Sequence, residues 1–80
     1  MELTWFKRDI IRPTGEFERE AVRHVQRVLR VPVTGDMDDP TIASLRGVQH
    51  VFGLRMTGIL DKPTAEEIEN IRNYYSVENE

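Results

Sequence analysis

The sequence predicts a single all-α domain of three helices, and three observations lead to this prediction. Apolar residues recur at helical spacing in three segments, at about residues 15–30, 39–52 and 62–75. The second and third segments each begin next to an aspartate with a proline two residues later, a common pattern at helix N-termini. A 23-residue repeat also runs through the chain, as expected for one supersecondary unit used twice.

The first helix is predicted from a stripe of apolar residues that would bury one helical face. These residues are Phe17, Ala21, Val22, Val25, Val28 and Leu29. Arg30 falls at the position where a helix usually ends with a left-handed glycine. A left-handed arginine costs roughly 1 kcal/mol, so two alternatives stay open: either this strain is real, or the loop is built differently.

The second and third helices are predicted from matching start signals and apolar stripes. Asp38 and Asp61 are expected to cap them by accepting the amide hydrogens of Thr41 and Thr64. Gly53 is expected to be the left-handed residue that ends the second helix. The apolar stripes consist of Ile42, Leu45, Val48 and Phe52 in the second helix and of Ala65, Ile68, Ile71 and Tyr75 in the third.

The repeat has eight identities when the chain is shifted by 23 residues, and both copies read V-Q-x-V-x-x-x-x-x-T-G-x-x-D-x-P-T. Gln26 and Gln49 are predicted to bond the backbone of the adjacent Thr-Gly loops, and ligand contact is the alternative. Gly35 and Gly58 are expected at positive φ, and Gly47 predicts close approach of another backbone. Four apolar residues should tuck the loops onto the helices: Val33, Met37, Met56 and Leu60.

These motifs resemble the type 1 peptidoglycan-binding domain over about 50 of the 80 residues. The matching positions include Val25, Gln26, Thr34, Gly35, Asp38, Thr41, Gln49, Gly53, Thr57, Gly58, Asp61 and Thr64. The resemblance implies a bundle of three α-helices that recognises cell-wall peptidoglycan without catalysis. Members of that family usually accompany amidases, muramidases, transpeptidases and phage endolysins. The resemblance is more specific for the fold than for the ligand, because one fold can serve several contacts.

Composition argues against several other classes of protein. The net charge of −3 disfavours a general nucleic-acid binder, and no apolar run approaches the ~20 residues of a membrane span. No nucleophile, phosphate-loop or zinc motif is present, so neither an enzyme nor a cofactor is expected. No metal is expected either, since the acidic residues Asp36, Asp38 and Asp39 lack the rest of a calcium loop. His24 and His50 have no ligand-like spacing.

The chain is expected to divide into an extended arm over residues 1–13, the helical domain over 14–75 and an acidic tail over 76–80. The arm carries four large apolar side chains: Trp5, Phe6, Ile10 and Ile11. Two alternatives stay open for it. It folds back over the open side of a thin core, or it docks on a partner through its aromatic residues.

Candidate contact residues fall into two chemical groups. Aromatic residues suited to stacking on sugar rings are Trp5, Tyr74 and Tyr75, and Trp5 and Phe6 are suited to anchoring a protein partner. Cationic residues suited to wall anions, or to an acidic partner, recur along the first helix: Arg19, Arg23, Arg27 and Arg30. The alternative for this stripe is a solvated face that is paired in part with Glu16 and Glu20.

The sequence therefore predicts a non-catalytic module, encoded by a bacteriophage, that binds peptidoglycan or another cell-wall glycan. The alternative is a bacteriophage virion structural protein, a capsid-decoration or tail/connector subunit, which uses the fold to contact other virion proteins. The N-terminal residues lack the pattern of a signal peptide. We expect synthesis in the cytoplasm and action at the cell wall after lysis or within a virion, without nucleic-acid or membrane partners.

Overall fold

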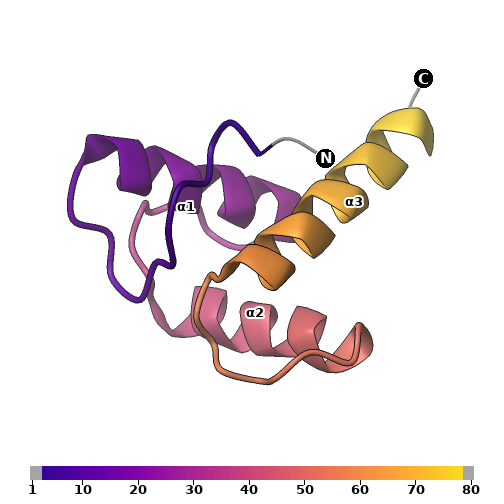
Figure 1. The fold of residues 1–80 in the computed structure, drawn as a ribbon. Coiled ribbons are helices and arrows are strands. Elements are labelled where there is room, and N and C mark those ends of the chain that lie inside the picture. The colour runs from indigo at the N-terminus through magenta and orange to yellow at the C-terminus, as the bar shows by residue number, and fades with distance from the viewer. Residues whose placement is uncertain (1–2, 79–80) are drawn as a thin grey trace.

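The protein is all-α, and the three predicted helices are present. A computed structural model describes the backbone of residues 3–78 and the side chains of residues 3–75. In chain order, α1 spans Glu16–Leu29, α2 spans Asp39–Val51 and α3 spans Lys62–Glu78 (Figure 1). The first two helices end within one residue of their predicted ends, whereas α3 continues into the predicted acidic tail. The side chains of that tail lie outside the described residues.

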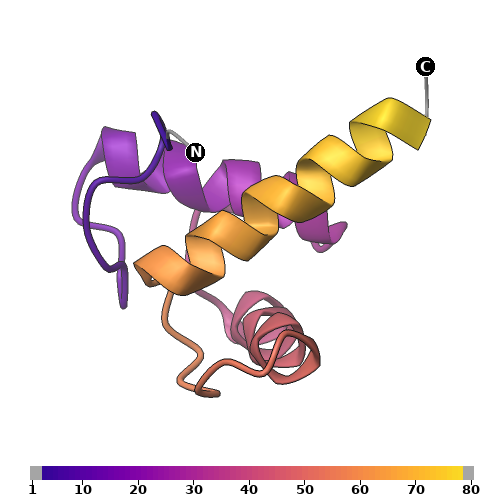
Figure 2. The same ribbon diagram turned by 45° about the vertical axis from the view of Figure 1, so that its right-hand side comes forward.

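The central element of the domain is α3. It packs against both α1 and α2, which contact each other less. In both ribbon views its C-terminal turns extend beyond the other two helices (Figures 1 and 2). The buried apolar core draws on all three helices and on the segments that precede α1 and α3. It consists of Ile10, Ala21, Val22, Val25, Leu45, Leu60, Ala65 and Ile68.

The N-terminal segment folds back onto these helices. Ile10 is buried and exchanges two backbone hydrogen bonds with Leu60. Its N–H donates to the Leu60 carbonyl at 2.9 Å, and its carbonyl accepts the Leu60 N–H at 3.1 Å. Three half-buried side chains pack against the same core: Leu3, Trp5 and Phe6. Of the two alternatives for the arm, these contacts correspond to folding back, although Ile11 remains exposed.

The end of α1 is strained. Arg30 takes the left-handed conformation with φ 61° and ψ 37°, so the strain alternative is the one that the fold adopts. The following amide donates to the carbonyl five residues back, at 3.1 Å after Arg30 and at 2.7 Å after Gly53. The two helix ends are therefore closed in the same way. Only the first carries a Cβ there, which costs roughly 1 kcal/mol.

A buried glutamine holds the loop between α1 and α2. The side-chain oxygen of Gln26 accepts the backbone amides of Thr34 and Gly35, both at 2.9 Å. Its amide group donates to the Asp36 carbonyl and to the Thr41 hydroxyl, also at 2.9 Å. The polar atoms of this side chain are thus used within the fold, which removes the cost of burying them.

Gln49 makes corresponding bonds in the loop between α2 and α3. Its oxygen accepts the Gly58 amide at 3.0 Å, and its amide group donates to the Ile59 carbonyl and the Thr64 hydroxyl at the same distance. The Thr64 hydroxyl in turn donates to the carboxylate of Asp61. The chain of hydrogen bonds therefore ends on a charged acceptor, which strengthens it.

The two aspartates act differently at the helix starts. Asp61 accepts the Thr64 amide at 3.1 Å, which is an N-cap bond. At Asp38 no side-chain cap hydrogen bond forms within residues 3–78, so the predicted cap is wrong there, although the nearby Thr41 amide still helps to lower the pKa of this carboxyl. Its carboxylate instead accepts hydrogen bonds from two hydroxyls. One is that of Thr41, and the other is that of Thr34 at 2.8 Å. These bonds, that from Thr41 above all, lower the pKa of Asp38.

Several residues predicted to be buried or closely approached are at the surface. Phe17 is exposed and lies beneath Lys7, whose Nζ is 4.8 Å from the ring centroid. Val33 and Met56 are exposed because the glutamine bonds, rather than apolar contacts, hold their loops. No backbone approaches Gly47 closely, because among the described residues a Cβ built there would meet nothing within 4 Å.

Replacing Gln49 by leucine should lower the free energy of unfolding by about 2–4 kcal/mol, because the Gly58 amide and the Ile59 carbonyl lose their partner. Gln26→Leu should cost a similar amount for the same reason. Urea unfolding followed by circular dichroism measures both losses. The exposed control Arg55→Gln should change stability by less than ~0.5 kcal/mol. Losses as small as the control's would contradict the role assigned to the glutamines.

Gly53 and Gly58 form a matched pair, with φ 71° and 72° but different surroundings. A Cβ on Gly53 would meet nothing within 4 Å among the described atoms, whereas one on Gly58 would lie 3.0 Å from Cγ2 of Ile42. Gly53→Ala should therefore cost only the backbone strain, roughly 1 kcal/mol. Gly58→Ala should cost a further ~1–3 kcal/mol from overpacking. Thermal melts test this, and equal losses would show that Ile42 yields freely.

Candidate functional site

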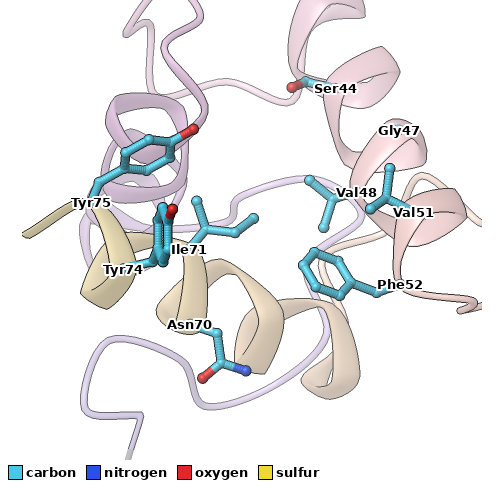
Figure 3. A pocket seen from close by; sticks show the side chains of 9 residues that line it. All are labelled: Ser44, Gly47, Val48, Val51, Phe52, Asn70, Ile71, Tyr74 and Tyr75. Carbon is cyan, nitrogen blue, oxygen red and sulfur yellow. The ribbon is translucent and has the colours of Figure 1, made fainter. Parts of the chain in front are cut away.

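An open groove with a volume of about 680 Å³ lies between α2 and α3. We call it the α2–α3 groove. The side chains of Val48 and Phe52 on one wall are directed toward Ile71 and Tyr74 on the other (Figure 3). The full lining consists of Ser44, Gly47, Val48, Val51, Phe52, Asn70, Ile71, Tyr74 and Tyr75.

The groove results from the way α3 is held. Its first turns bury Ala65 and Ile68, while its later turns extend past α2 (Figures 1 and 2). Apolar residues that helical spacing assigns to the core are consequently only partly covered. Phe52 and Tyr75, both predicted to face the core, are 43% and 44% exposed. Gly47 adds no side chain to fill the space.

The lining is apolar with a few polar groups. The rings of Tyr74 and Tyr75 meet edge to face, with centroids 5.6 Å apart. The guanidinium of Arg30 lies 5.1 Å from the centroid of the Tyr75 ring, in the geometry of a cation–π contact. Apolar walls with a few hydrogen-bonding groups are typical of sites for organic ligands. The groove can therefore offer both ring faces and polar contacts.

The predicted aromatic contact residues do not share one surface. Tyr74 and Tyr75 line the groove. Trp5 and Phe6 pack against the core instead, with ring centroids 6.1 Å apart in an edge-on arrangement. Much of the apolar area of these two rings is thus used within the fold.

The predicted arginine stripe is divided between two environments. Arg19 pairs with Asp36 at 3.0 Å, and Arg23 pairs with Glu16 at 3.1 Å and with Glu20. The hydrogen bonds that Arg23 donates, first to Glu20 and then to Glu16, raise the pKa of Arg23. Exposed pairs of this kind contribute little stability, so this part of the stripe is a solvated, self-paired face. The other two members, Arg27 and Arg30, line a separate hollow with residues of α3.

A further cluster joins the N-terminal segment to α1 and α3. Nε1 of Trp5 donates to Oε1 of Glu69 at 3.0 Å, and the Trp5 ring lies 4.7 Å from that of His24. Nε2 of His24 is 3.5 Å from the same carboxylate oxygen, but it is buried without a hydrogen bond within the described residues. Burial lowers the pKa of His24, Glu69 opposes this shift, and Arg72 and Arg27 add to it.

Seven groove residues were not among the predicted contacts: Ser44, Gly47, Val48, Val51, Phe52, Asn70 and Ile71. Helical spacing places three of them, Val48, Phe52 and Ile71, on the apolar stripes, but it does not reveal that they stay exposed or only half-buried beside the groove. One signal was available. Val51 is apolar although it stands beside the predicted core stripe, and it is 75% exposed. An apolar residue off the stripe can therefore mark an exposed apolar surface.

The depressed pKa of His24 makes stability depend on pH. Below the ordinary histidine pKa of about 6.5, the unfolded chain takes up a proton before the folded one does. The stability that neutral His24 contributes to the folded state is therefore complete above that pH. It is lost as the pH falls from about 6.5 through the lower pKa of His24 in the folded state. Urea unfolding at pH 7.5 and 5.5 should show this decline in the wild type and a smaller one in His24→Gln. The control His50→Gln should keep the decline, and an unchanged decline in His24→Gln would contradict this assignment.

Comparison with known proteins does not identify the chain. No protein-family model, curated protein or solved structure matches it. Within the described residues, no group of three or more His, Cys, Asp or Glu side chains could hold a metal ion. None of the helices in this part of the chain has the length and apolarity needed to cross a membrane. Its function is therefore inferred from the side chains that the fold presents.

Proposed function

We propose that this chain is a non-catalytic module that binds bacterial peptidoglycan in the α2–α3 groove. The observation that carries the proposal is the pair of adjacent tyrosines on the wall of a mainly apolar groove. Aromatic rings with a polar edge suit sugars, which present an apolar face and a rim of hydroxyls. An open groove also suits a segment of a long polymer, which a closed cavity would exclude.

The architecture supports the same proposal. Three helices joined by loops with a doubled Gln, Thr-Gly, Asp and Thr pattern are what the resemblance to the peptidoglycan-binding domain implies. We infer that the fold is of that type and that the 23-residue repeat is its structural unit. In support, Gln26 and Gln49 make corresponding bonds to the loops that follow them. The pattern thus has a physical role in each copy, independent of any ligand.

A second candidate function rests on the apolar character of the same surface. Val51, Phe52, Tyr74 and Tyr75 are all exposed around the groove. Contiguous apolar patches rich in aromatic residues are also typical of protein–protein interfaces. The alternative is therefore a bacteriophage virion subunit that uses this surface to bind another virion protein.

Co-sedimentation with purified sacculi tests the first proposal. The wild type should sediment with the wall, and Tyr74→Ala and Tyr75→Ala should each weaken binding at least fivefold, which corresponds to about 1 kcal/mol. Melting temperatures should change little, because both rings are largely exposed. Phe17→Ala is the matched control, since it removes an exposed ring outside the groove.

The outcome also separates the two candidates. A wild type that stays in the supernatant with sacculi of several wall types would reject peptidoglycan binding. Light scattering of the same samples reports self-association, and assembly that is lost in the tyrosine variants would favour the virion alternative. Equal loss of wall binding in Phe17→Ala would show that the groove is not the site.

A further inference from the structure

A second hollow, of about 300 Å³, lies between the C-terminal half of α1 and the outer half of α3. It is lined by His24, Arg27, Val28, Arg30, Arg72 and Tyr75, and we call it the basic hollow. Three of the eleven lysines and arginines meet here, in a chain whose net charge is −3. No acidic side chain of the described residues is part of its lining. Such local concentration of one charge focuses the potential on the opposite charge.

Arg30 is held in this hollow at the expense of backbone strain. It is the one non-glycine residue with positive φ among residues 3–78, and the sequence repeat places Gly53 at the equivalent position. Glycine closes the second helix with the same hydrogen bond, so closure does not require an arginine. Strained residues cluster at binding sites, where the side chain has a use that the backbone conformation alone does not explain.

The three guanidinium groups are only partly neutralised. Arg72 donates weakly to Glu69, at 3.4 Å, and to the Asn73 side chain, at 3.2 Å. Arg30 faces the ring of Tyr75 rather than a carboxylate. Arg27 has no side-chain hydrogen bond or ion pair within the described part of the chain. Guanidinium groups carry forked N–H donors that match the geometry of carboxylate and phosphate oxygens.

Two further observations bear on an anion in this position. Glu69 lies beside the hollow, 3.5 Å from Nε2 of His24 and 3.4 Å from Nη1 of Arg72, so one carboxylate faces its three guanidinium groups. The negative end of the α1 dipole lies nearby and would oppose an anion. Two of its terminal carbonyls, however, already accept the amides of Arg30 and Val31. The side-chain charges therefore dominate at the hollow.

We propose that the basic hollow binds an oxyanion carried by the ligand of the α2–α3 groove. Tyr75 lines both the hollow and the groove, so one ligand can contact both. If the ligand is peptidoglycan, the oxyanion is a carboxylate of the wall peptide, and to that extent the inference rests on the proposed function. A phosphate group of another wall polymer has the same chemistry, and the test distinguishes the two.

Nuclear magnetic resonance titration at constant ionic strength provides the test, with three probes: acetyl-D-alanyl-D-alanine, its C-terminal amide and inorganic phosphate. The carboxylate peptide should shift the resonances of the hollow and raise the pKa of His24, and the amide should do neither. Arg30→Gly should weaken binding of the carboxylate at least fivefold. Its melting temperature should stay the same or rise, because glycine relieves the strain. Arg55→Gln, which removes an exposed charge outside the hollow, should bind like the wild type.

Three results would overturn the inference: undiminished binding in Arg30→Gly, equal weakening in Arg55→Gln, or no response of His24 to any probe. Binding of phosphate alone would support the oxyanion site and overturn its assignment to the wall peptide. Sedimentation with sacculi separates this inference from the proposed function. Equal sedimentation of wild type and Arg30→Gly would reject the binding of a wall oxyanion in the basic hollow and would leave the proposed function unaffected. A wild type that binds the carboxylate peptide but not sacculi would reject the proposed function only.

Discussion

Two buried chains of hydrogen bonds, each running from a glutamine through a threonine to an aspartate, organise this domain. In each chain the glutamine lies in one helix, and the threonine lies in the first turn of the next. An apolar core made largely of alanine, valine and leucine contributes limited burial in 80 residues. Directional bonds supply what such a core lacks, because they fix the loop conformation as well as the distance between helices.

The same bonds explain why so much apolar surface remains exposed. The loops are held by Gln26 and Gln49, so Val33 and Met56 are free to face solvent. The first turns of α3 are fixed twice, by the bond from Gln49 to Thr64 and by the segment preceding α3, which pairs with the N-terminal segment. In its later turns Tyr74 and Tyr75 remain exposed beside α2. The α2–α3 groove lies where this network ends.

The helices could be predicted from the sequence because their signals are local. Apolar spacing, Pro40 and Gly53 give the ranges of α1 and α2 to within a residue, and Pro63 marks the start of α3. The hydrogen-bonding partners of Gln26 and Gln49 were also predictable, since a residue repeated beside a repeated loop has a role in that loop. The orientation of the Asp38 carboxylate was not, because two hydroxyls compete with an amide for it. Local patterns do not resolve such competition.

The candidate site was predictable only in part, for a different reason. Tyr74 and Tyr75 are recognisable as aromatic residues near a helix end, but the groove depends on how far α3 extends past α2. The basic hollow is likewise a tertiary feature, since Arg27 and Arg72 are far apart in sequence. Two of its arginines carried a sequence signal: Arg27 and Arg30 belong to the predicted arginine stripe, and Arg30 also replaces a glycine between the copies. Where two copies of one unit agree, the residues are explained by the fold they share. Where the copies differ and the difference strains the backbone, as at Arg30, the fold does not explain the residue. Arg30 contacts the ring of Tyr75, which lines both the α2–α3 groove and the basic hollow, so ligand binding is an explanation that fits its position.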